Sequence, residues 1–392
     1  MEKHVHWLMF VWTFSSLSFA ECQLPTNDKP PIVLGMSTAL SGPVQYLGES
    51  MRDGVQAYFN KVNCLGGLHG REVKLITRDD GYQPSAALMN VKKLIMQDEV
   101  LAIIGNVGTP TAKLTAPYIT QQKRVFYAPY TGAGILRNQP ADEYIFNFRA
   151  SYAQEMQAII KHIFKNGIKP GEIAFFLQDD AYGQAGLNAA TKVLTHYGFT
   201  HMDELPVTRY PRNTVDVDGA IIQLLDLVKP PKAIILVGAY AASAKFINHS
   251  YNLFSHTLFY NLSFSGATAL SNELAVSSDR VFITQVVPFL AHTSVIKEVF
   301  KGDLNMFLPN VMPNEISFEG YLSAYLFIEA LQQYMEEINA EGIKSALEAL
   351  SVSQIDFGSS LSFSSTDHQA SDKVWMMQYQ YQKGFVKQVE EE

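Results

Sequence analysis

Strand-like and helix-like stretches alternate along most of this chain, and this alternation constrains its fold more than any other feature. Near the start, short apolar, β-branched or aromatic runs predict strands at 32–36, 73–78, 101–105 and 125–128. Apolar residues at i, i+3 and i+4 predict helices at 49–63, 84–97 and 111–121. Such an order is typical of strand–helix–strand units around a parallel sheet.

A second set of the same kind follows in the middle of the chain. Its expected strands are 172–177, 233–237, 258–260 and 281–287. Its expected helices are 153–166, 183–197, 215–228 and 241–252. The remaining segments are helices at 295–305, 316–335 and 340–350 and a β-rich stretch centred on 374–381. The chain is therefore predicted to be an α/β protein with two doubly wound parallel-sheet domains.

No low-complexity or Pro/Gly/Ser-rich linker separates the two sets, so we expect short crossover strands between the domains rather than a flexible tether. The segments that suit such crossovers are 144–149 and 282–287. The predicted division is an N-terminal lobe of 31–148 plus 288–362 and a C-terminal lobe of 149–287 plus 363–392. Two lobes joined by a multi-strand hinge form a cleft that can close around a small molecule.

The N-terminus has the pattern of a secretory signal peptide. An apolar run at 5–14 leads to small residues at Ser18 and Ala20, which are positions −3 and −1 of a cleavage point. We therefore expect a soluble protein exported to the periplasm, with cleavage after Ala20. A lipid anchor on Cys22 would require a small residue directly before the cysteine, and Glu21 stands there.

Composition excludes several classes of function. With 38 acidic and 30 basic residues the formal net charge is −8, and no basic region suits nucleic acid as a partner. Cys22 and Cys64 form neither a CxxC motif nor a Cys/His group with metal-ligand spacing, which argues against structural zinc and dithiol redox chemistry. An oxidising compartment would allow the two cysteines to form a bridge, but two unbridged thiols fit the sequence at least as well.

The ends of the predicted strands are the places to look for a ligand, because free N–H groups and the helix dipole there favour anions. Four segments hold such positions: 105–111, 128–134, 178–183 and 238–240. The first two are rich in glycine and hydroxyl groups, and Thr109 or Thr111 is expected to cap the following helix. The last two each place a tyrosine at a strand end, Tyr182 and Tyr240.

Motifs of enzymes are missing from the sequence. It has no nucleotide P-loop, no GxGxxG fingerprint, no G-x-S-x-G motif and no HExxH. The acidic pairs Asp79–Asp80 and Asp179–Asp180 each follow a predicted strand, where neighbours point to opposite faces, so we expect solvated or capping roles for them. We expect neither catalysis nor a bound metal or cofactor.

Several segments taken together resemble the periplasmic solute-binding proteins of the branched-chain amino acid (leucine/isoleucine/valine-binding) class of ABC importers. The matching segments are 35–43 with Gly48, 62–70, 79–80, 104–105, 178–183 and 319–321. This similarity covers nearly all of the chain after the signal peptide, and it implies the type I periplasmic-binding fold. The family's usual disulfide is not expected, since Tyr82 and Gly108 stand at its positions.

The resemblance also implies a set of ligand-binding residues. Thr109 stands at the family's Ser/Thr that receives the ligand carboxylate at a helix N-terminus, and Thr131 with Ala133 stands at the loop that completes this cradle. Tyr182 and Tyr240 stand at the two tyrosines of the second domain that close over the ligand. These positions agree with the strand ends identified above.

Two acidic positions of the family are not acidic in this chain. Ser265 stands where leucine-type binders carry the Glu that pairs with the ligand's ammonium, and Gln154 stands at the family's Asp beyond the first crossover. A buried ammonium without a carboxylate would cost several kcal/mol. Either Glu319 or Asp180 therefore replaces the missing acid, or the ligand is not an α-amino acid.

Two functions remain open on this evidence. The resemblance favours a monomeric subunit of an ABC importer, which binds an amino acid or a related carboxylate and delivers it to permease subunits in the membrane. The alternative is a ligand-sensing protein that acts through a membrane partner. Neither the ligand's identity nor the choice between transport and sensing follows from the sequence.

Overall fold

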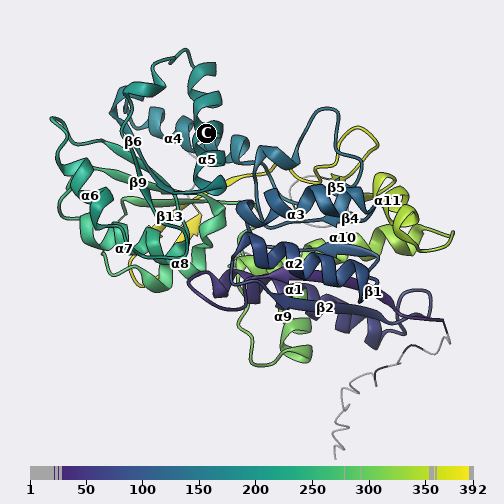
Figure 1. The fold of residues 1–392 in the computed structure, drawn as a ribbon. Helices are drawn as coiled ribbons and strands as arrows, with labels where there is room; N and C mark the ends of the chain where they lie inside the picture. The colour runs from purple at the N-terminus through teal and green to yellow at the C-terminus, as the bar shows by residue number, and fades with distance from the viewer. Residues whose placement is uncertain are drawn as a thin grey trace, which may run out of the picture.

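Two lobes, each a β-sheet covered by helices, lie side by side in the computed structural model (Figure 1). The structure describes residues 22, 25, 29–277, 279–291, 293–352, 357 and 360–387. The predicted signal peptide lies outside the described residues. In the described part of the chain, no helix combines the length and the hydrophobicity needed to cross a membrane.

The first lobe is built on a five-stranded parallel sheet with the order β2-β1-β3-β4-β5. Its strands are β1 (Ile32–Thr38), β2 (Val73–Asp79), β3 (Ala102–Ile104), β4 (Val125–Tyr127) and β5 (Ile145–Phe146). Its connecting helices are α1 (Gln45–Cys64), α2 (Pro84–Met96) and α3 (Thr109–Gln121). The four predicted strands and three predicted helices of this region are confirmed, and β5 lies within the segment expected to be a crossover.

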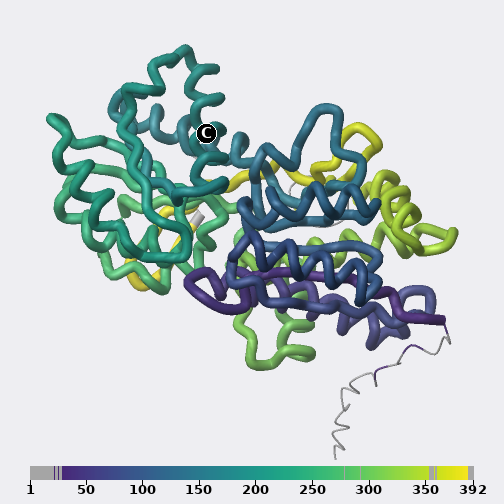
Figure 2. The backbone as a smooth tube through the Cα atoms, viewed as in Figure 1, coloured from purple at the N-terminus to yellow at the C-terminus, as the bar shows by residue number. Residues whose placement is uncertain are grey.

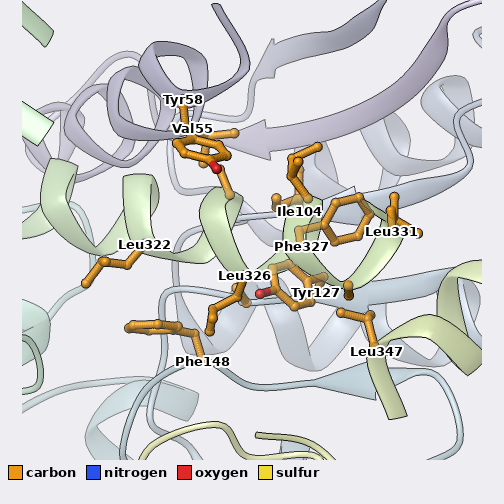
Figure 3. Close-up of a cluster of buried hydrophobic side chains, with 14 of the residues drawn as sticks. Val55, Tyr58, Ile104, Tyr127, Phe148, Leu322, Leu326, Phe327, Leu331 and Leu347 are labelled. Carbon is orange, nitrogen blue, oxygen red and sulfur yellow. The ribbon is translucent and has the colours of Figure 1, made fainter. Parts of the chain in front are cut away.

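Helix α10 (Glu315–Gln333) comes late in the chain but packs along α1 in the first lobe. Gly54 permits this close approach, because a Cβ there would lie 1.9 Å from the carbonyl oxygen of Ser317. Figure 3 shows side chains of α1, the sheet and α10 sharing one core, including Tyr58, Tyr127 and Phe327. The other late elements are α9 (Val295–Phe307), α11 (Ala340–Glu348), β11 (Ser351–Val352) and β12 (Leu361–Ser362).

The second lobe has a seven-stranded sheet with the order β14-β13-β10-β9-β8-β6-β7. Its strands are β6 (Ile173–Gln178), β7 (Val207–Tyr210), β8 (Ala233–Val237), β9 (Leu258–Asn261), β10 (Val281–Gln285), β13 (Trp375–Gln380) and β14 (Gly384–Lys387). The sheet is mixed rather than purely parallel, because β13 pairs antiparallel with β10 and β14 with β13. The type I arrangement of two doubly wound α/β lobes is confirmed.

Helices cover both faces of this second sheet. They are α4 (Tyr152–Lys165), α5 (Ala181–His196), α6 (Asp218–Leu225), α7 (Tyr240–Ser250) and α8 (Ala267–Glu273). Single 3₁₀ turns are η1 (Gly134–Leu136), η2 (Pro170–Glu172), η3 (Met202–Glu204) and η4 (Ser263–Ser265). The short elements β7, β14 and α8 were not predicted, because runs of four to seven residues carry little periodic signal.

The chain passes between the lobes more than once, as the tube in Figure 2 shows for the late segment before β13. Two of these passages are joined to each other: Asn147 N donates to His368 O at 2.7 Å, and Ala370 N donates to Asn147 O at 2.8 Å. The segment 282–287 is not a crossover over its whole length, since its first part is β10 within the large sheet. The lobe boundaries themselves stay predictions.

Cys22 and Cys64 form a disulfide, so the bridge that the sequence left open is present in the structure. Cys64 is the last residue of α1, and the bridge ties the start of the chain to the first lobe. Because the Cys22 sulfur is used in this bond, it is not available for a lipid thioether.

Candidate functional site

Three hydroxyl groups meet where α3 begins. The Oγ1 atoms of Thr109 and Thr131 are 2.7 Å apart, and the Tyr152 hydroxyl lies 3.5 Å from the first and 3.3 Å from the second. The backbone N–H of Ala133 donates to Thr131 Oγ1 at 3.2 Å. All four residues are buried. The structure thus places Thr109, Thr131 and Ala133 together and adds Tyr152, which sequence reasoning missed; we call these four residues the cradle.

The N-terminus of α3 at this point has no capping side chain. Its N-cap residue is Gly108, with φ +105°, and no side chain accepts a hydrogen bond from the first turn. Thr111 instead donates its hydroxyl back to the carbonyl oxygens of Val107 and Gly108. The expectation that Thr109 or Thr111 caps the helix is therefore wrong, and the uncapped N–H groups suit an anion.

Aromatic rings from the second lobe cover the cradle. Tyr182, at the start of α5, lies 5.6 Å from Tyr152 and 4.4 Å from Phe264 between ring centroids, and Phe264 lies 5.6 Å from Tyr130. Burial raises the pKa of Tyr152 and of Tyr182, so both phenols are neutral and can donate hydrogen bonds. The Tyr182 hydroxyl has no hydrogen-bond partner.

The two lobes touch directly around this region, so the structure represents a closed arrangement. Gln178 Nε2 donates to the Tyr82 hydroxyl at 3.2 Å, and the Tyr130 hydroxyl donates to Ser263 O at 3.1 Å. A third contact runs from Asn213 Nδ2 to the carbonyl oxygen of Gly81 at 3.0 Å. Each bond joins a residue of the first lobe to a residue of the second, so opening the cleft would break all three.

Tyr82 and Gly108, the positions where the family disulfide was not expected, are in contact with each other. A Cβ on Gly108 would lie 2.2 Å from Cε2 of Tyr82, so the ring occupies this space. Asp80 positions Tyr82 by accepting from its backbone N–H at 2.9 Å, and it also accepts from Ser37 Oγ at 2.7 Å. Asp80 is buried, whereas its neighbour Asp79 is exposed, so a solvated role holds only for Asp79.

Asp80 should make stability depend on pH. Burial raises the pKa of its carboxyl from 3.8 to about 6, so the folded protein holds a proton that the unfolded chain releases. The free energy of unfolding should therefore fall as the pH rises between roughly 4 and 6. Urea unfolding at several pH values in this range should show that the free energy of unfolding of Asp80→Asn depends less on pH than that of the wild type. An equally steep pH dependence in the variant would contradict this assignment.

Tyr240 and Ser265 lie apart from the cradle hydrogen bonds. Tyr240, half-buried at the start of α7, faces Tyr46 of the first lobe with ring centroids 6.3 Å apart. Ser265 donates its hydroxyl to the carbonyl oxygen of Gly238 at 2.8 Å. Tyr240 therefore contacts the first lobe, whereas Ser265 is bonded within the second lobe near the end of β8, and neither residue is part of the hydroxyl cluster.

The two carboxylates considered as countercharges already have partners. Glu319 accepts from Arg149 Nε at 2.9 Å and from Nη2 at 3.0 Å, and both side chains are buried. Asp180 accepts from Tyr182 N at 2.8 Å and from Gln178 Nε2 at 2.7 Å, and Arg212 lies nearby. Neither carboxylate is left unpaired to receive a ligand's cation.

Gln154 and Glu155 have separate structural positions at the start of α4. Gln154 Oε1 accepts from the Ser151 backbone N–H at 2.7 Å and completes the capping box of the helix. Glu155 is fully buried, on the face of α4 that also carries Tyr152 and Ile159. An acidic residue inside an apolar stripe was a signal available in the sequence, and sequence reasoning did not use it.

No group of three or more His, Cys, Asp or Glu side chains among the described residues could hold a metal ion.

Comparison with known families agrees with this geometry. A periplasmic binding protein model matches residues 31–384, which is most of the chain. The chain belongs to the periplasmic binding protein family. This membership implies a periplasmic location, and the family and fold are those of solute-binding proteins that work with ABC transporters.

Similarity to individual relatives covers nearly all of this chain. Leu/Ile/Val-binding protein homolog 7 of Brucella abortus (strain 2308) is 22% identical over 402 residues, covering 98% of this chain and 95% of its own length. The crystal structure of a possible leucine/isoleucine/valine-binding protein from Rhodopirellula baltica SH 1 is 35% identical, with a TM-score of 0.87. That match covers 92% of this chain and 96% of the other, so the similarity includes both lobes.

Proposed function

We propose that this protein is the exported solute-binding subunit of an ABC importer and that it captures a small carboxylated solute between its lobes. The observation that carries the proposal is the cradle itself. Two threonine hydroxyls of the first lobe and the neutral hydroxyl of Tyr152 from the second lobe cluster at an uncapped helix N-terminus, next to the ring of Tyr182. A carboxylate there would accept several hydrogen bonds in a site closed to water.

Carboxylated ligands in proteins of the same fold support the proposal. A branched-chain amino acid ABC transporter structure from Thermus thermophilus, 16% identical with a TM-score of 0.77, holds valine. A solute-binding protein from R. palustris, 17% identical with a TM-score of 0.77, is in complex with 4-hydroxybenzoate. Both ligands carry a carboxylate, and they differ in the rest of the molecule.

Solute binding should close the lobes and shrink the molecule. The purified protein is unfolded to release any retained solute, which mass spectrometry identifies, and is then refolded. Small-angle scattering of the refolded protein with and without that solute is the test. The radius of gyration should fall on binding, because the interlobe hydrogen bonds of Tyr82, Tyr130 and Asn213 form only when the lobes meet. An unchanged radius with calorimetrically confirmed binding would argue against capture by closure.

We also propose that the mature protein begins at Glu21 and is soluble. The support is the Ser18–Ala20 cleavage pattern together with the use of the Cys22 sulfur in the bridge to Cys64. The intact mass of exported protein should equal that of 21–392 less two hydrogens. A mass that includes a diacylglyceryl group, or residues 1–20, would contradict the proposal.

A further inference from the structure

Arg137 is a partly buried arginine whose side chain binds the loop of the cradle. Its Nη1 donates to the carbonyl oxygen of Ala133 at 3.0 Å, and Nη1 and Nη2 lie 3.3 and 3.4 Å from the carbonyl oxygen of Thr131. Thr131 and Ala133 are fully buried, so solvent water does not replace these bonds. The guanidinium therefore satisfies buried carbonyl groups of the loop that presents the Thr131 hydroxyl.

The same guanidinium also binds the two joined passages between the lobes. Nη2 donates to the carbonyl oxygen of Arg149 at 3.0 Å, and Nε donates to Oε1 of Gln369 at 2.8 Å. Gln369 Nε2 in turn donates at 2.9 Å to Oε1 of Gln154, which completes the capping box of α4. One side chain thus connects the cradle loop to the helix that begins with Tyr152.

This network fixes the two sources of cradle hydroxyls relative to each other. Thr131 lies in the loop after β4, whereas Tyr152 lies at the start of α4, and their hydroxyl oxygens are 3.3 Å apart. One direct link joins the two segments, because Tyr152 N donates to the carbonyl oxygen of Gly132 at 2.7 Å. Arg137 adds the second link, through Gln369. Donors that are held in place before a solute binds lose less entropy when it does.

The charge of Arg137 is balanced by its neighbours. Burial, the largest effect, and the charge of Arg149 lower the pKa of Arg137 to about 9, whereas Glu155 and Glu319 act in the opposite direction. The guanidinium is therefore charged at neutral pH. Two positive and two negative side chains share this region, so Arg137 gives the cradle no net positive charge. Its contribution is the geometry of its hydrogen bonds.

From this arrangement we infer that Arg137 is a positioning residue of the cradle, which holds the loop of Thr131 and the start of α4 so that their hydroxyl groups converge on the solute's carboxylate. The inference rests on the proposed function, since it takes the cradle as the carboxylate site. Arg137 acts through Thr131 and Tyr152 rather than on the solute itself. The role requires arginine, because a lysine ammonium keeps the charge but cannot serve four separate oxygens from one plane.

A double-mutant cycle tests whether Arg137 acts through the cradle. The probes are L-valine and 4-hydroxybenzoate, two carboxylates of different shape, and titration calorimetry measures their affinities. Arg137→Lys should weaken the binding of a probe about tenfold. In a Thr131→Ala background the same change should cost only about twofold, because one of the two hydroxyl groups that Arg137 positions is then missing.

Arg280→Lys is the matched control for this variant. The Arg280 guanidinium also donates to loop carbonyl oxygens, those of Tyr251, Phe254 and Thr257. Arg280 directly precedes β10, at the end of the sheet opposite to the carboxyl ends of the parallel strands, so its bonds do not reach the cradle. Arg280→Lys should therefore leave both affinities at the wild-type value.

Gln369→Met is a second variant that leaves Arg137 in place. The methionine has a similar length but neither accepts from Arg137 Nε nor donates to Gln154. It should weaken the binding of a probe about threefold, because it breaks only one of the two links to α4. Thermal unfolding of each variant checks that it is folded, and Gln369→Met keeps the test open if Arg137→Lys is not.

Amide hydrogen exchange of the solute-free protein gives a readout that needs no probe. The N–H of Tyr152 donates to Gly132 O and that of Ala133 donates to Thr131 Oγ1. Both amides should exchange at least about threefold faster in Arg137→Lys than in the wild type, because the loop opens locally more often. In Arg280→Lys they should exchange as in the wild type.

Two results would overturn the role of Arg137. One is wild-type exchange of these two amides in folded Arg137→Lys, and the other is an affinity loss for Arg137→Lys that is equally large with and without Thr131. Both would leave carboxylate capture itself standing. Failure of the proposed function looks different, since Thr109→Ala would then bind a probe like the wild type. If the wild type binds neither probe, the exchange rates alone decide whether Arg137 holds the loop.

Discussion

Glu319→Gln should lower the free energy of unfolding by about 3–5 kcal/mol, because it leaves the Arg149 guanidinium buried without its countercharge. Both oxygens of Glu319 bind this guanidinium, and the side chains are 3% and 1% exposed. The Tyr130 ring, 4.1 Å from the guanidinium carbon, does not replace a carboxylate. The measurement is urea unfolding of the ligand-free protein followed by circular dichroism.

Two further variants make the result specific to the ion pair. Glu329→Gln changes a half-buried residue of the same helix that forms no ion pair within the described chain, and it should be close to neutral. Arg149→Met combined with Glu319→Gln removes both charges and should recover part of the lost stability. A loss below about 1 kcal/mol for Glu319→Gln alone would show that the pair does not matter for folding.

Thr109→Ala should weaken solute binding about tenfold to a hundredfold, the effect of losing one hydrogen bond to a charged group. The expectation rests on Thr109 Oγ1, which lies 2.7 Å from Thr131 Oγ1 at the uncapped start of α3. Titration calorimetry with the solute identified by mass spectrometry measures it. Stability should change less than affinity, because Thr131 and Tyr152 can still bond to each other.

Thr115→Ala on the same helix is the matched control for this variant. Its hydroxyl is also buried, but it donates to the Thr111 carbonyl oxygen at 2.9 Å, within the helix. Affinity should therefore stay at the wild-type value. If Thr109→Ala and Thr115→Ala bind alike, the carboxylate does not lie in the cradle.

The order of strands and helices followed from local sequence patterns. β6 is apolar over most of its length because a parallel strand is buried on both faces, and α1 and α10 carry apolar residues at helical spacing. Strand ends can also be predicted from the sequence, and this is why Thr109, Thr131 and Tyr182 were candidates before the structure showed that they lie close together. Edge strands such as β7, which has only four residues of alternating burial, give a pattern too weak to predict a strand from the sequence.

Partners distant in the chain were decided only by the tertiary structure. Arg149 and Glu319 are separated by 170 residues, and nothing in the periodicity around either one predicts the other. The same holds for the Cys22–Cys64 bridge, for the contact of the Tyr82 ring with Gly108, and for the hydrogen bond from the Ser263 N–H to Glu155. Local sequence determines which face of an element is apolar, because a residue's near neighbours set that periodicity. Which polar groups pair with one another depends on how distant segments pack: Glu155 Oε2 accepts from the Ser263 N–H and the Thr284 hydroxyl, which stand 108 and 129 residues further along the chain.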